Sequence, residues 1–292
     1  MGWKKFALTS LLVCGVIFIA MGFKWLSLRD GGRVVAESLG GRVVAPNSEH
    51  LSEKRLVNIV EEIALASGTP VPPIYLLENE HGINAFAAGL SPEDAVIGVT
   101  QGCLDYFNRE QLQGVVAHEF SHILNGDMRL NMKLIAVLHG ILMISESGRT
   151  FMSMSSVRRH GFGRSHGRSG LSSGFFVFGL SLWLIGSLGE LFGALIKSAV
   201  SRQREFLADA SAVQFTRNPE GIGEALSIIG GSVDQSRVEH NGAHEVGHLF
   251  FSSATLFRKS YAKALHAKFA LFATHPPLEQ RIKRVLPRWR GR

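Results

Sequence analysis

The residues His118, Glu119 and His122 form the pattern His-Glu-x-x-His. On a helix, His118 and His122 lie one turn apart, so both imidazoles point to the same side and can bind one metal ion. Glu119 lies beside them, where it can take a proton from a water molecule on that metal. These residue types at this spacing therefore predict a catalytic metal site.

The stretch from Asn108 to Asp127 has the features of the helix that this spacing requires. Asn108 and Gln111 make a capping-box pattern at its start, and Gly126 is a natural stop. Between them, apolar residues recur at roughly helical spacing: Leu112, Val115, Val116, Phe120, Ile123 and Leu124. Such a helix is buried, and burial makes a glutamate and two histidines costly unless they have a task. We therefore prefer a metal site to the alternative of ordinary core or surface histidines.

A third metal ligand is needed, because a zinc enzyme site typically takes three protein ligands and leaves one position to water. The helix predicted for Ser201–Phe215 carries Glu205 and Asp209, which are four residues apart and share a face. A lone glutamate there would usually be a solvated charge. Beside a two-histidine site, Glu205 becomes the leading candidate, and Asp209 is placed to hold a ligand imidazole by a hydrogen bond.

The pattern His-Glu-x-x-His occurs a second time, at His244–His248. Gly247 lies inside this copy, and its flanks lack a long periodic helix. The nearest downstream acid is Glu279, which follows two prolines. We therefore expect the start of a structural helix or an adventitious metal site here, since catalytic geometry needs a rigid helix.

Two segments are candidates for crossing a membrane. Phe6–Leu28 is nearly continuous apolar sequence, and its length favours an anchor over a cleaved signal peptide, for which no cleavage site stands out. Phe175–Ile196 is interrupted only by Glu190, a costly residue that usually faces protein or water. Within it, Gly189 and Gly193 form a GxxxG step that lets another helix approach closely.

A helical hairpin is predicted between two halves of a catalytic domain. Its first arm, Leu130–Ile144, is apolar but broken by Lys133 and His139, and it is short for a membrane span. Its second arm is Phe175–Ile196. Between the arms, Met152–Gly174 is rich in Ser, Gly, Arg and His, a composition that cannot bury a core and predicts a flexible loop beginning near residue 149.

The sequence before the metal helix predicts a small sheet. Ser52–Ser67 is an amphipathic helix closed by Gly68 and Pro70. Three strand candidates follow, separated by Gly and Pro: Ile74–Leu77, Asn84–Ala88 and Ala95–Thr100. They indicate a sheet beside the metal helix, with a free edge that can accept an extended peptide as an added strand.

These features divide the chain into five parts: an anchor at 1–30, a linker at 31–51, a first catalytic part at 52–129, a membrane hairpin at 130–200 and a second catalytic part at 201–292. Within the linker the unit GGRVVA occurs twice, beginning at Gly31 and Gly40. Two copies are too few for a solenoid, so we interpret them as a pair of short β-prone pieces.

The composition limits the partners. The 292 residues include 31 Lys and Arg against 24 Asp and Glu, a formal charge of +7. This positive charge is compatible with binding to an anionic membrane surface, but it is too small to predict binding to nucleic acid. Cys14 and Cys103 lie far apart in different contexts, so we expect neither a disulfide framework nor a metal bound by cysteine.

Taken in order, the motifs resemble those of the HtpX-like membrane zinc metalloproteases, a family that includes the CAAX prenyl proteases. The matching motifs are HEFSH at 118–122 followed by NGD at 125–127, SRQREFLADA at 201–210, THPPLEQRI at 274–282 and INAFAAG at 83–89. The likeness covers roughly Ser52 to Arg292. The ordered set is far more specific than any one motif.

The resemblance implies a mainly helical α+β fold, a gluzincin-type metalloprotease domain interrupted by a transmembrane hairpin. It implies one Zn²⁺ per chain, with the ligands His118, His122 and Glu205. Glu119 would be the general base and Asp209 a supporting acid, with His275 and Arg281 as candidates near the transition state. The strand that receives substrate would be formed by Asn84, Ala85, Phe86 and Ala87.

The function predicted is therefore that of a membrane-bound zinc endopeptidase acting on polypeptides. By resemblance its targets are damaged or misfolded membrane proteins, and it lies in the bacterial inner membrane with a cytoplasm-facing site. One alternative is a CAAX-type prenyl-protein protease, which would need an intramembrane cavity. The other is a membrane scaffold or chaperone with a structural metal. Glu119 argues against that scaffold, because a structural site needs no base and is normally closed by four ligands.

Overall fold

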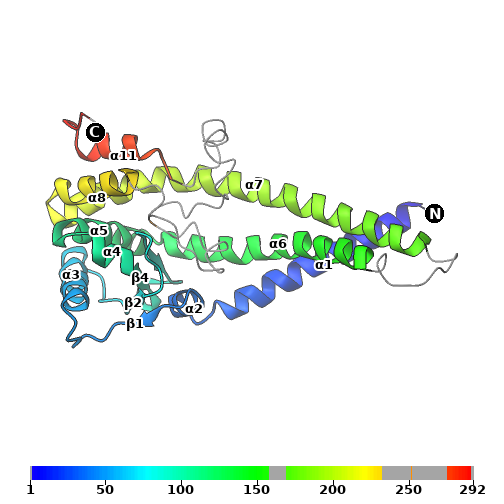
Figure 1. Ribbon diagram of the computed structural model, residues 1–292, viewed down its shortest axis with the longest axis horizontal. Helices are drawn as coiled ribbons and strands as arrows, with labels where there is room; N and C mark the ends of the chain where they lie inside the picture. The colour runs from blue at the N-terminus through cyan, green and yellow to red at the C-terminus, as the bar shows by residue number, and fades with distance from the viewer. Residues whose placement is uncertain (1, 158–168, 232–250, 252–274, 291–292) are drawn as a thin grey trace. The chain divides into compact units, whose positions relative to one another are not determined.

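The computed structural model of the 292-residue chain describes residues 2–157, 169–231, 251 and 275–290 (Figure 1). The chain divides into two compact units. We call the first the helical unit, Met1–Leu26 with Leu134–Ile196, and the second the mixed unit, Ser27–Lys133 with Lys197–Arg292. Each is described by itself. The second His-Glu-x-x-His pattern, His244–His248, lies outside the described residues.

The helical unit contains α1 (Gly2–Ser27) and large parts of α6 (Asp127–Val157) and α7 (Ser169–Thr216). The predicted GxxxG step lies where α6 and α7 meet. A Cβ atom at Gly189 would stand 2.7 Å from Ile141 Cγ2, and one at Gly193 would stand 2.5 Å from Leu138 Cδ2. These glycines therefore allow the close helix approach that the sequence predicts.

The first arm of the hairpin is longer than predicted, and the second lies close to its predicted bounds. Within the described part of the chain, Asp127–Met154 and Gly174–Gly193 are each long and apolar enough to cross a membrane, so the first arm is not short for a span. The loop prediction is wrong at both ends, because helix continues to Val157 and resumes at Ser169. Aromatic contacts between the arms extend the helix pair there. The ring centroid of Phe151 lies 6.2 Å from that of Phe175 and 5.3 Å from that of Phe178.

The mixed unit contains a four-stranded sheet in the order β1-β2-β4-β3. Its strands are β1 (Arg42–Val43), β2 (Ile74–Leu77), β3 (Ala85–Ala88) and β4 (Val96–Thr100). Only β2 and β4 run parallel, and β3 lies at one edge with β4 as its partner. The three predicted strands are confirmed to within one residue. Strands β2, β3 and β4 are buried on both faces, which fits their short apolar runs.

The two copies of GGRVVA take different structures, so the prediction of two β-prone pieces is wrong for the first. The first copy forms α2 (Gly32–Ser38), which begins against the sheet: a Cβ atom at Gly32 would stand 2.1 Å from the Ala88 carbonyl oxygen. The second copy pairs with β2 as strand β1. Pro46 favours extended backbone just before it, whereas helix-compatible Glu37 and Ser38 follow the first copy.

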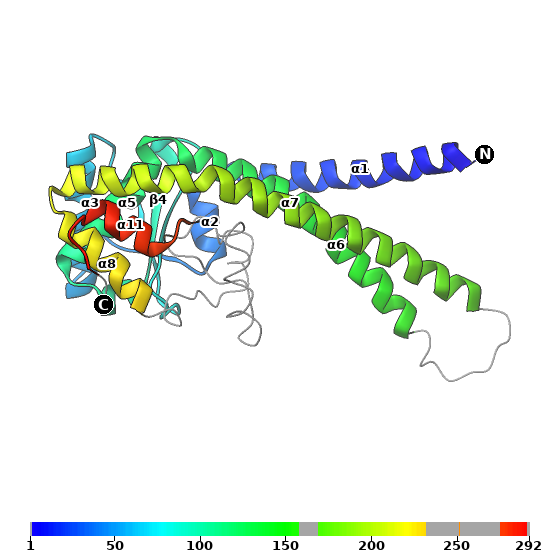
Figure 2. The same cartoon turned by 90° about the horizontal axis from the view of Figure 1, so that it is seen from above.

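Helices cover the sheet and form most of the core. They are α3 (Leu51–Ser67), α4 (Gln101–Tyr106), α5 (Arg109–Leu124), α8 (Pro219–Gly231) and α11 (Leu278–Val285). α5 contacts α3, α8 and β3, so it lies at the centre of the mixed unit. The approach of α8 is close, because a Cβ atom at Gly114 would stand 2.6 Å from the Ile222 backbone nitrogen. Figure 2 shows α8 and α11 beside the last turns of α7.

Candidate metal centre

The helix that carries the His-Glu-x-x-His pattern is fixed at both ends as predicted. The Asn108 side chain accepts from the Gln111 N–H over 2.9 Å, and the Gln111 side chain accepts from the Asn108 N–H over 3.0 Å. Gly126 follows the helix with φ of 70°, a conformation that glycine adopts without strain. These caps, together with the apolar face, hold α5 rigid and bury His118 and Glu119 completely.

The structure brings His118, His122 and Glu205 together. The two Nε2 atoms lie 3.2 Å apart, and Glu205 carboxylate oxygens lie 3.7 Å from His118 Nε2 and 3.8 Å from His122 Nε2. Ligands at about 2.0–2.1 Å in tetrahedral geometry would be roughly 3.3 Å apart. The three side chains, with all ligand atoms within 4.8 Å of one another, therefore fit one metal ion.

His118 is oriented by Asp209, the aspartate that shares a face with Glu205. His118 Nδ1 lies 3.0 Å from Asp209 Oδ1, which turns Nε2 towards the metal position. Arg281 donates to both oxygens of Asp209, from Nε over 2.8 Å and from Nη2 over 2.7 Å. Burial lowers the pKa of His118 to about 4, so the imidazole is neutral, as a metal ligand must be.

His122 has a similar support that sequence reasoning did not assign. Its Nδ1 lies 3.0 Å from Asp127 Oδ2, and Arg204 forms an ion pair with the other oxygen of Asp127. Asp127 is the first residue of α6, a position that favours a carboxylate. The signal available in the sequence was an acid five residues after His122. Nothing local identified Arg204, which lies 77 residues away.

Glu119 is poised for proton transfer. It is 1% exposed, and neither of its carboxylate oxygens has a hydrogen-bond partner among the described residues. Burial raises the pKa of Glu119 to about 7, although the neighbouring His122 and the Ala87 N–H act in the opposite direction. A carboxyl group with a pKa near 7 is suited to take up a proton and release it again.

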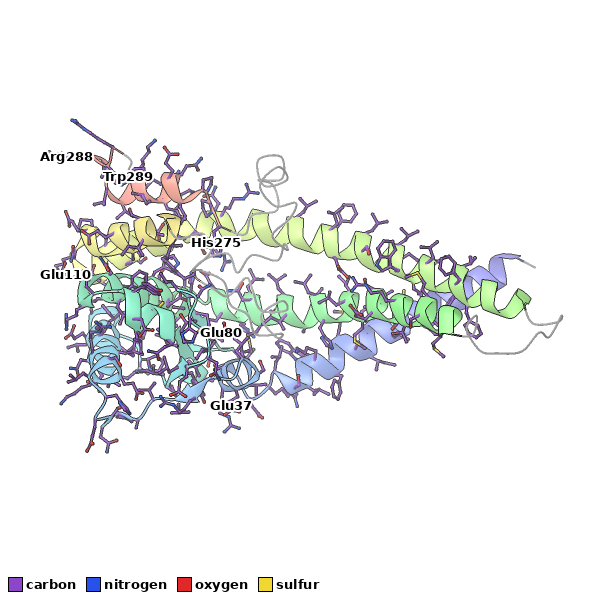
Figure 3. All side chains as sticks on the ribbon, in the orientation of Figure 1. Glu37, Glu80, Glu110, His275, Arg288 and Trp289 are labelled. Carbon is purple, nitrogen blue, oxygen red and sulfur yellow. The ribbon has the colours of Figure 1, made fainter. Side chains whose placement is uncertain are left out.

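Two residues of the C-terminal part of the chain lie at the same place: His275, just before α11 (Figure 3), and Arg281, within α11. Glu205 Oε2 lies 2.8 Å from His275 Nδ1 and 3.2 Å from Arg281 Nη1, without hydrogen-bond geometry in either case. Burial alone would raise the pKa of Glu205, but the charges of His275 and Arg281 outweigh it and hold that pKa below its usual value. Both groups thus border the proposed metal ligands.

Several buried polar atoms at this point have no hydrogen-bond partner among the described residues: both Glu119 oxygens, Glu205 Oε2, both His275 ring nitrogens and Arg281 Nη1. Buried polar groups normally find partners, so such a cluster is expected where a site takes up groups from outside the chain. A metal ion, a water molecule and a peptide carbonyl are groups that these donors and acceptors would bind.

The predicted substrate strand, Asn84 to Ala87, forms the end of the sheet beside these residues. The Asn84 carbonyl oxygen accepts from the Thr100 N–H of β4 over 3.0 Å, so it faces into the sheet. The Ala85 carbonyl oxygen faces the open edge and accepts from the Phe251 N–H over 2.8 Å. Phe251 was not identified from the sequence: it lies three residues after the second His-Glu-x-x-His pattern, and nothing in that pattern indicates a contact with β3.

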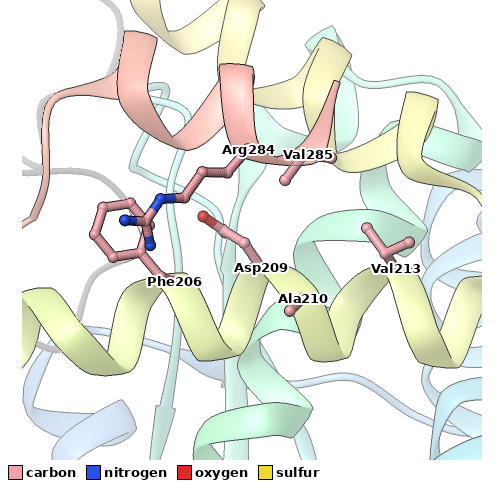
Figure 4. A pocket seen from close by; sticks show the side chains of 6 residues that line it. All are labelled: Phe206, Asp209, Ala210, Val213, Arg284 and Val285. Carbon is pink, nitrogen blue, oxygen red and sulfur yellow. The ribbon is translucent and has the colours of Figure 1, made fainter. Parts of the chain in front are cut away.

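A separate pocket of about 400 Å³ lies between α7 and α11, lined by Phe206, Asp209, Ala210, Val213, Arg284 and Val285 (Figure 4). The Arg284 guanidinium stands over the Phe206 ring at 3.6 Å from its centroid. Of the proposed site residues only Asp209 lines it. The pocket therefore lies behind the support of His118 and is not the place where the candidate catalytic groups meet.

Comparison with known proteins identifies the family of the chain. The model of peptidase family M48 matches residues 50–288. A protease HtpX homolog of Thermoanaerobacter pseudethanolicus is 37% identical over 274 residues, which are 94% of this chain and 83% of that protein. A protease HtpX homolog of Streptococcus thermophilus is 32% identical over 294 residues, 95% of this chain and 93% of that protein.

Among solved structures, the crystal structure of S. mikatae Ste24p is similar in part. It has a TM-score of 0.43 and 16% sequence identity, and the match covers 95% of this chain. The chain spans only 56% of the length of that structure. At this level of similarity the assignment rests on the family match and the two homologs.

Proposed function

The chain belongs to peptidase family M48 and is a membrane metalloprotease; from this premise we propose that it is a zinc endopeptidase. We assign His118, His122 and Glu205 as the ligands of one zinc ion and Glu119 as the general base. The observation that carries the proposal is the convergence of three ligand atoms beside a buried carboxylate whose oxygens lack partners in the described residues.

The proposed chemistry uses the residues in fixed roles. When bound, zinc would lower the pKa of a water molecule and polarise the scissile carbonyl group. Glu119 takes the proton from the attacking water and passes it to the leaving amine, a role that its pKa near 7 suits. His275 and Arg281, which lie 2.8 Å and 3.2 Å from Glu205, stabilise the negative charge that develops on the carbonyl oxygen.

Asp209 has a supporting role in this scheme. It receives two hydrogen bonds from Arg281 and contacts His118 through the ring nitrogen that faces away from the metal position. It therefore fixes the orientation of one ligand and of the arginine that faces the carbonyl oxygen. Asp127 does the same for His122.

The substrate lies extended along the open edge of β3. Ala85 and Ala87 face this edge, and the Ala87 N–H is near enough to Glu119 to affect its pKa. A peptide added there as a strand passes the base and the metal ligands. This support favours polypeptides over isolated amino acids or short prenylated tails, because main-chain pairing needs several residues.

The non-catalytic scaffold is disfavoured by the same residues, since a structural metal has no use for a buried base with free oxygens. The CAAX-type prenyl-protein protease is distinguished by substrate: cleavage of a farnesylated peptide with no cleavage of casein would favour it. We further propose damaged or misfolded membrane proteins as natural targets, a site facing the cytoplasm and a location in the bacterial inner membrane. Reporter fusions at the C-terminus test that orientation.

The test compares wild type with Glu119→Gln, both purified full length in detergent and loaded with zinc. Gln keeps the size of the side chain but cannot act as the base. We expect the variant to retain about one zinc per chain and to lose casein digestion by roughly 10²–10⁴-fold, the usual contribution of a general base. Normal digestion by the variant would overturn the assignment of Glu119, and absence of zinc from the active wild type would overturn the zinc site.

A further inference from the structure

The open edge of β3 is paired with a residue of the chain itself. In an antiparallel sheet, successive residues of a strand turn their N–H and C=O groups to opposite sides. Asn84 bonds to β4, so Ala85 faces away from the sheet, and its carbonyl oxygen accepts from the Phe251 N–H over 2.8 Å. Phe251 thus makes the main-chain hydrogen bond that an added peptide strand would make.

The side chain of Phe251 is buried against the metal centre. Its ring centroid lies 4.8 Å from that of His118, with the two rings nearly perpendicular at 89°. The Arg281 guanidinium carbon lies 4.9 Å from the same centroid, and Phe251 is 2% exposed. Edge-to-face and cation–π contacts therefore hold the ring between a proposed zinc ligand and a proposed carbonyl-binding group.

We propose that Phe251 is a built-in occupant of the substrate site. Its main chain holds the β3 edge at Ala85, and its ring fills the subsite for one substrate side chain. This inference rests on the proposed function, because it takes the β3 edge as the place where substrate binds. A substrate must displace Phe251 to pair with Ala85, so its apparent affinity is reduced by the fraction of molecules in which the site is free.

The occupant also indicates the substrate class. The position that Phe251 vacates is bordered by the His118 ring and the Arg281 guanidinium, surfaces that favour an aromatic ring. The site therefore selects polypeptides that present an aromatic side chain in an extended segment. Such residues are exposed in unfolded chains and buried in folded ones, so the selection distinguishes an unfolded substrate from a folded protein.

A Phe251 that stays in place as a wall of the site would behave in the opposite way. Removing the ring would then take contacts away from the substrate and weaken its binding. Removing an occupant instead frees the site and strengthens binding. The sign of the change in peptide affinity therefore separates the two roles.

The experiment measures binding without hydrolysis, on zinc-loaded full-length protein in detergent carrying Glu119→Gln. The probes are two fluorescein-labelled unstructured heptapeptides that differ only in a central Phe or Gly, followed by fluorescence anisotropy. We expect Phe251→Ala to tighten binding of the Phe peptide by about 10-fold, because the variant keeps the backbone N–H that bonds to Ala85 but loses the ring contacts with His118 and Arg281. The Gly peptide should gain less. Tyr106→Ala, which removes a half-exposed aromatic ring, serves as the control and should change neither affinity.

Phe251→Leu keeps most of the buried volume and provides a second variant if Phe251→Ala does not fold, as judged by circular dichroism. It should tighten binding of the Phe peptide by about 3-fold, because part of the ring contact is lost. Unchanged or weaker peptide binding in folded Phe251 variants would contradict the proposal that Phe251 occupies the substrate site. It would leave the proposed function intact. If no variant bound either peptide while all retained zinc, the proposal that substrate binds along β3 would be wrong. The inference about Phe251, which rests on that proposal, would then be wrong as well.

Discussion

His118 and His122 are each held by an aspartate and an arginine, but the two supports differ in burial. In the first, His118, Asp209 and Arg281 have side chains that are 0%, 3% and 0% exposed. In the second, His122, Asp127 and Arg204 are 14%, 7% and 38% exposed. Charge pairs out of water interact strongly and depend on every partner, whereas pairs near the surface are screened.

The two histidine ligands of one metal ion therefore depend on their supporting residues to different degrees. The buried support joins helices α5, α7 and α11, so it holds distant parts of the mixed unit together as well as one imidazole. The exposed support joins α5, the first residue of α6 and α7. We therefore expect the first support to govern folding and metal binding, and the second to adjust metal binding only.

The largest effect should follow from Arg281→Met. The substitution leaves Asp209 and Glu205 buried without their arginine, and breaking a buried charge pair typically costs about 3–5 kcal/mol. We expect a lower yield of folded protein and a free energy of unfolding reduced by about that amount, measured by denaturant titration of the detergent-solubilised chain. Arg281→Lys restores a charge but not the two-point contact, so it should recover stability in part. Wild-type stability in Arg281→Met would remove the distinction between the supports.

Metal affinity should be affected next, and unequally. Substitutions of residues that orient a ligand typically cost about 10–100-fold in affinity or activity. We expect Asp209→Asn to fall near the upper end of this range, because it lies in the buried support. Asp127→Asn should fall near the lower end, because water can reach His122 and take over part of the hydrogen bonding. Zinc retention under graded chelator measures both, and the reverse order would contradict the comparison.

The smallest effect is expected from Arg204→Met. The guanidinium is 38% exposed, and surface ion pairs contribute no more than about 1 kcal/mol. Its loss leaves Asp127 in place and still able to accept a hydrogen bond from His122 Nδ1. We expect thermal stability within a few degrees of wild type and zinc retention reduced less than in Asp127→Asn. A collapse of metal binding in this variant would mean that the exposed support is as critical as the buried one.

Much of this arrangement follows from local sequence. The Asn108–Gln111 capping box and the apolar spacing of α5 are encoded within one helix, and the strands β2, β3 and β4 lie within short apolar runs bounded by Gly and Pro. Glu205 and Asp209 were found because helical spacing gives them one face. Each of these features depends on residues a few positions apart, which is the range that sequence patterns report.

The parts that were missed depend on contacts between distant residues. GGRVVA becomes helix or strand according to whether Gly32 lies against Ala88 or Arg42 pairs with Leu76, and the six letters are the same. Arg204 finds Asp127 across 77 residues. Phe251 contacts β3 and His118 through a backbone N–H and a ring, neither of which leaves a pattern in the sequence.

The central claim is that His118, His122 and Glu205 bind one zinc ion, and X-ray absorption at the zinc edge tests it most directly. For the zinc-loaded full-length protein we predict two imidazoles and oxygen donors at about 2.0–2.1 Å, with no sulfur. The spectrum should persist when His244→Ala and His248→Ala are combined, and the zinc should be lost far more readily in Glu205→Ala. A spectrum with additional imidazoles that changes in the His244 and His248 double variant but not in Glu205→Ala would contradict the account.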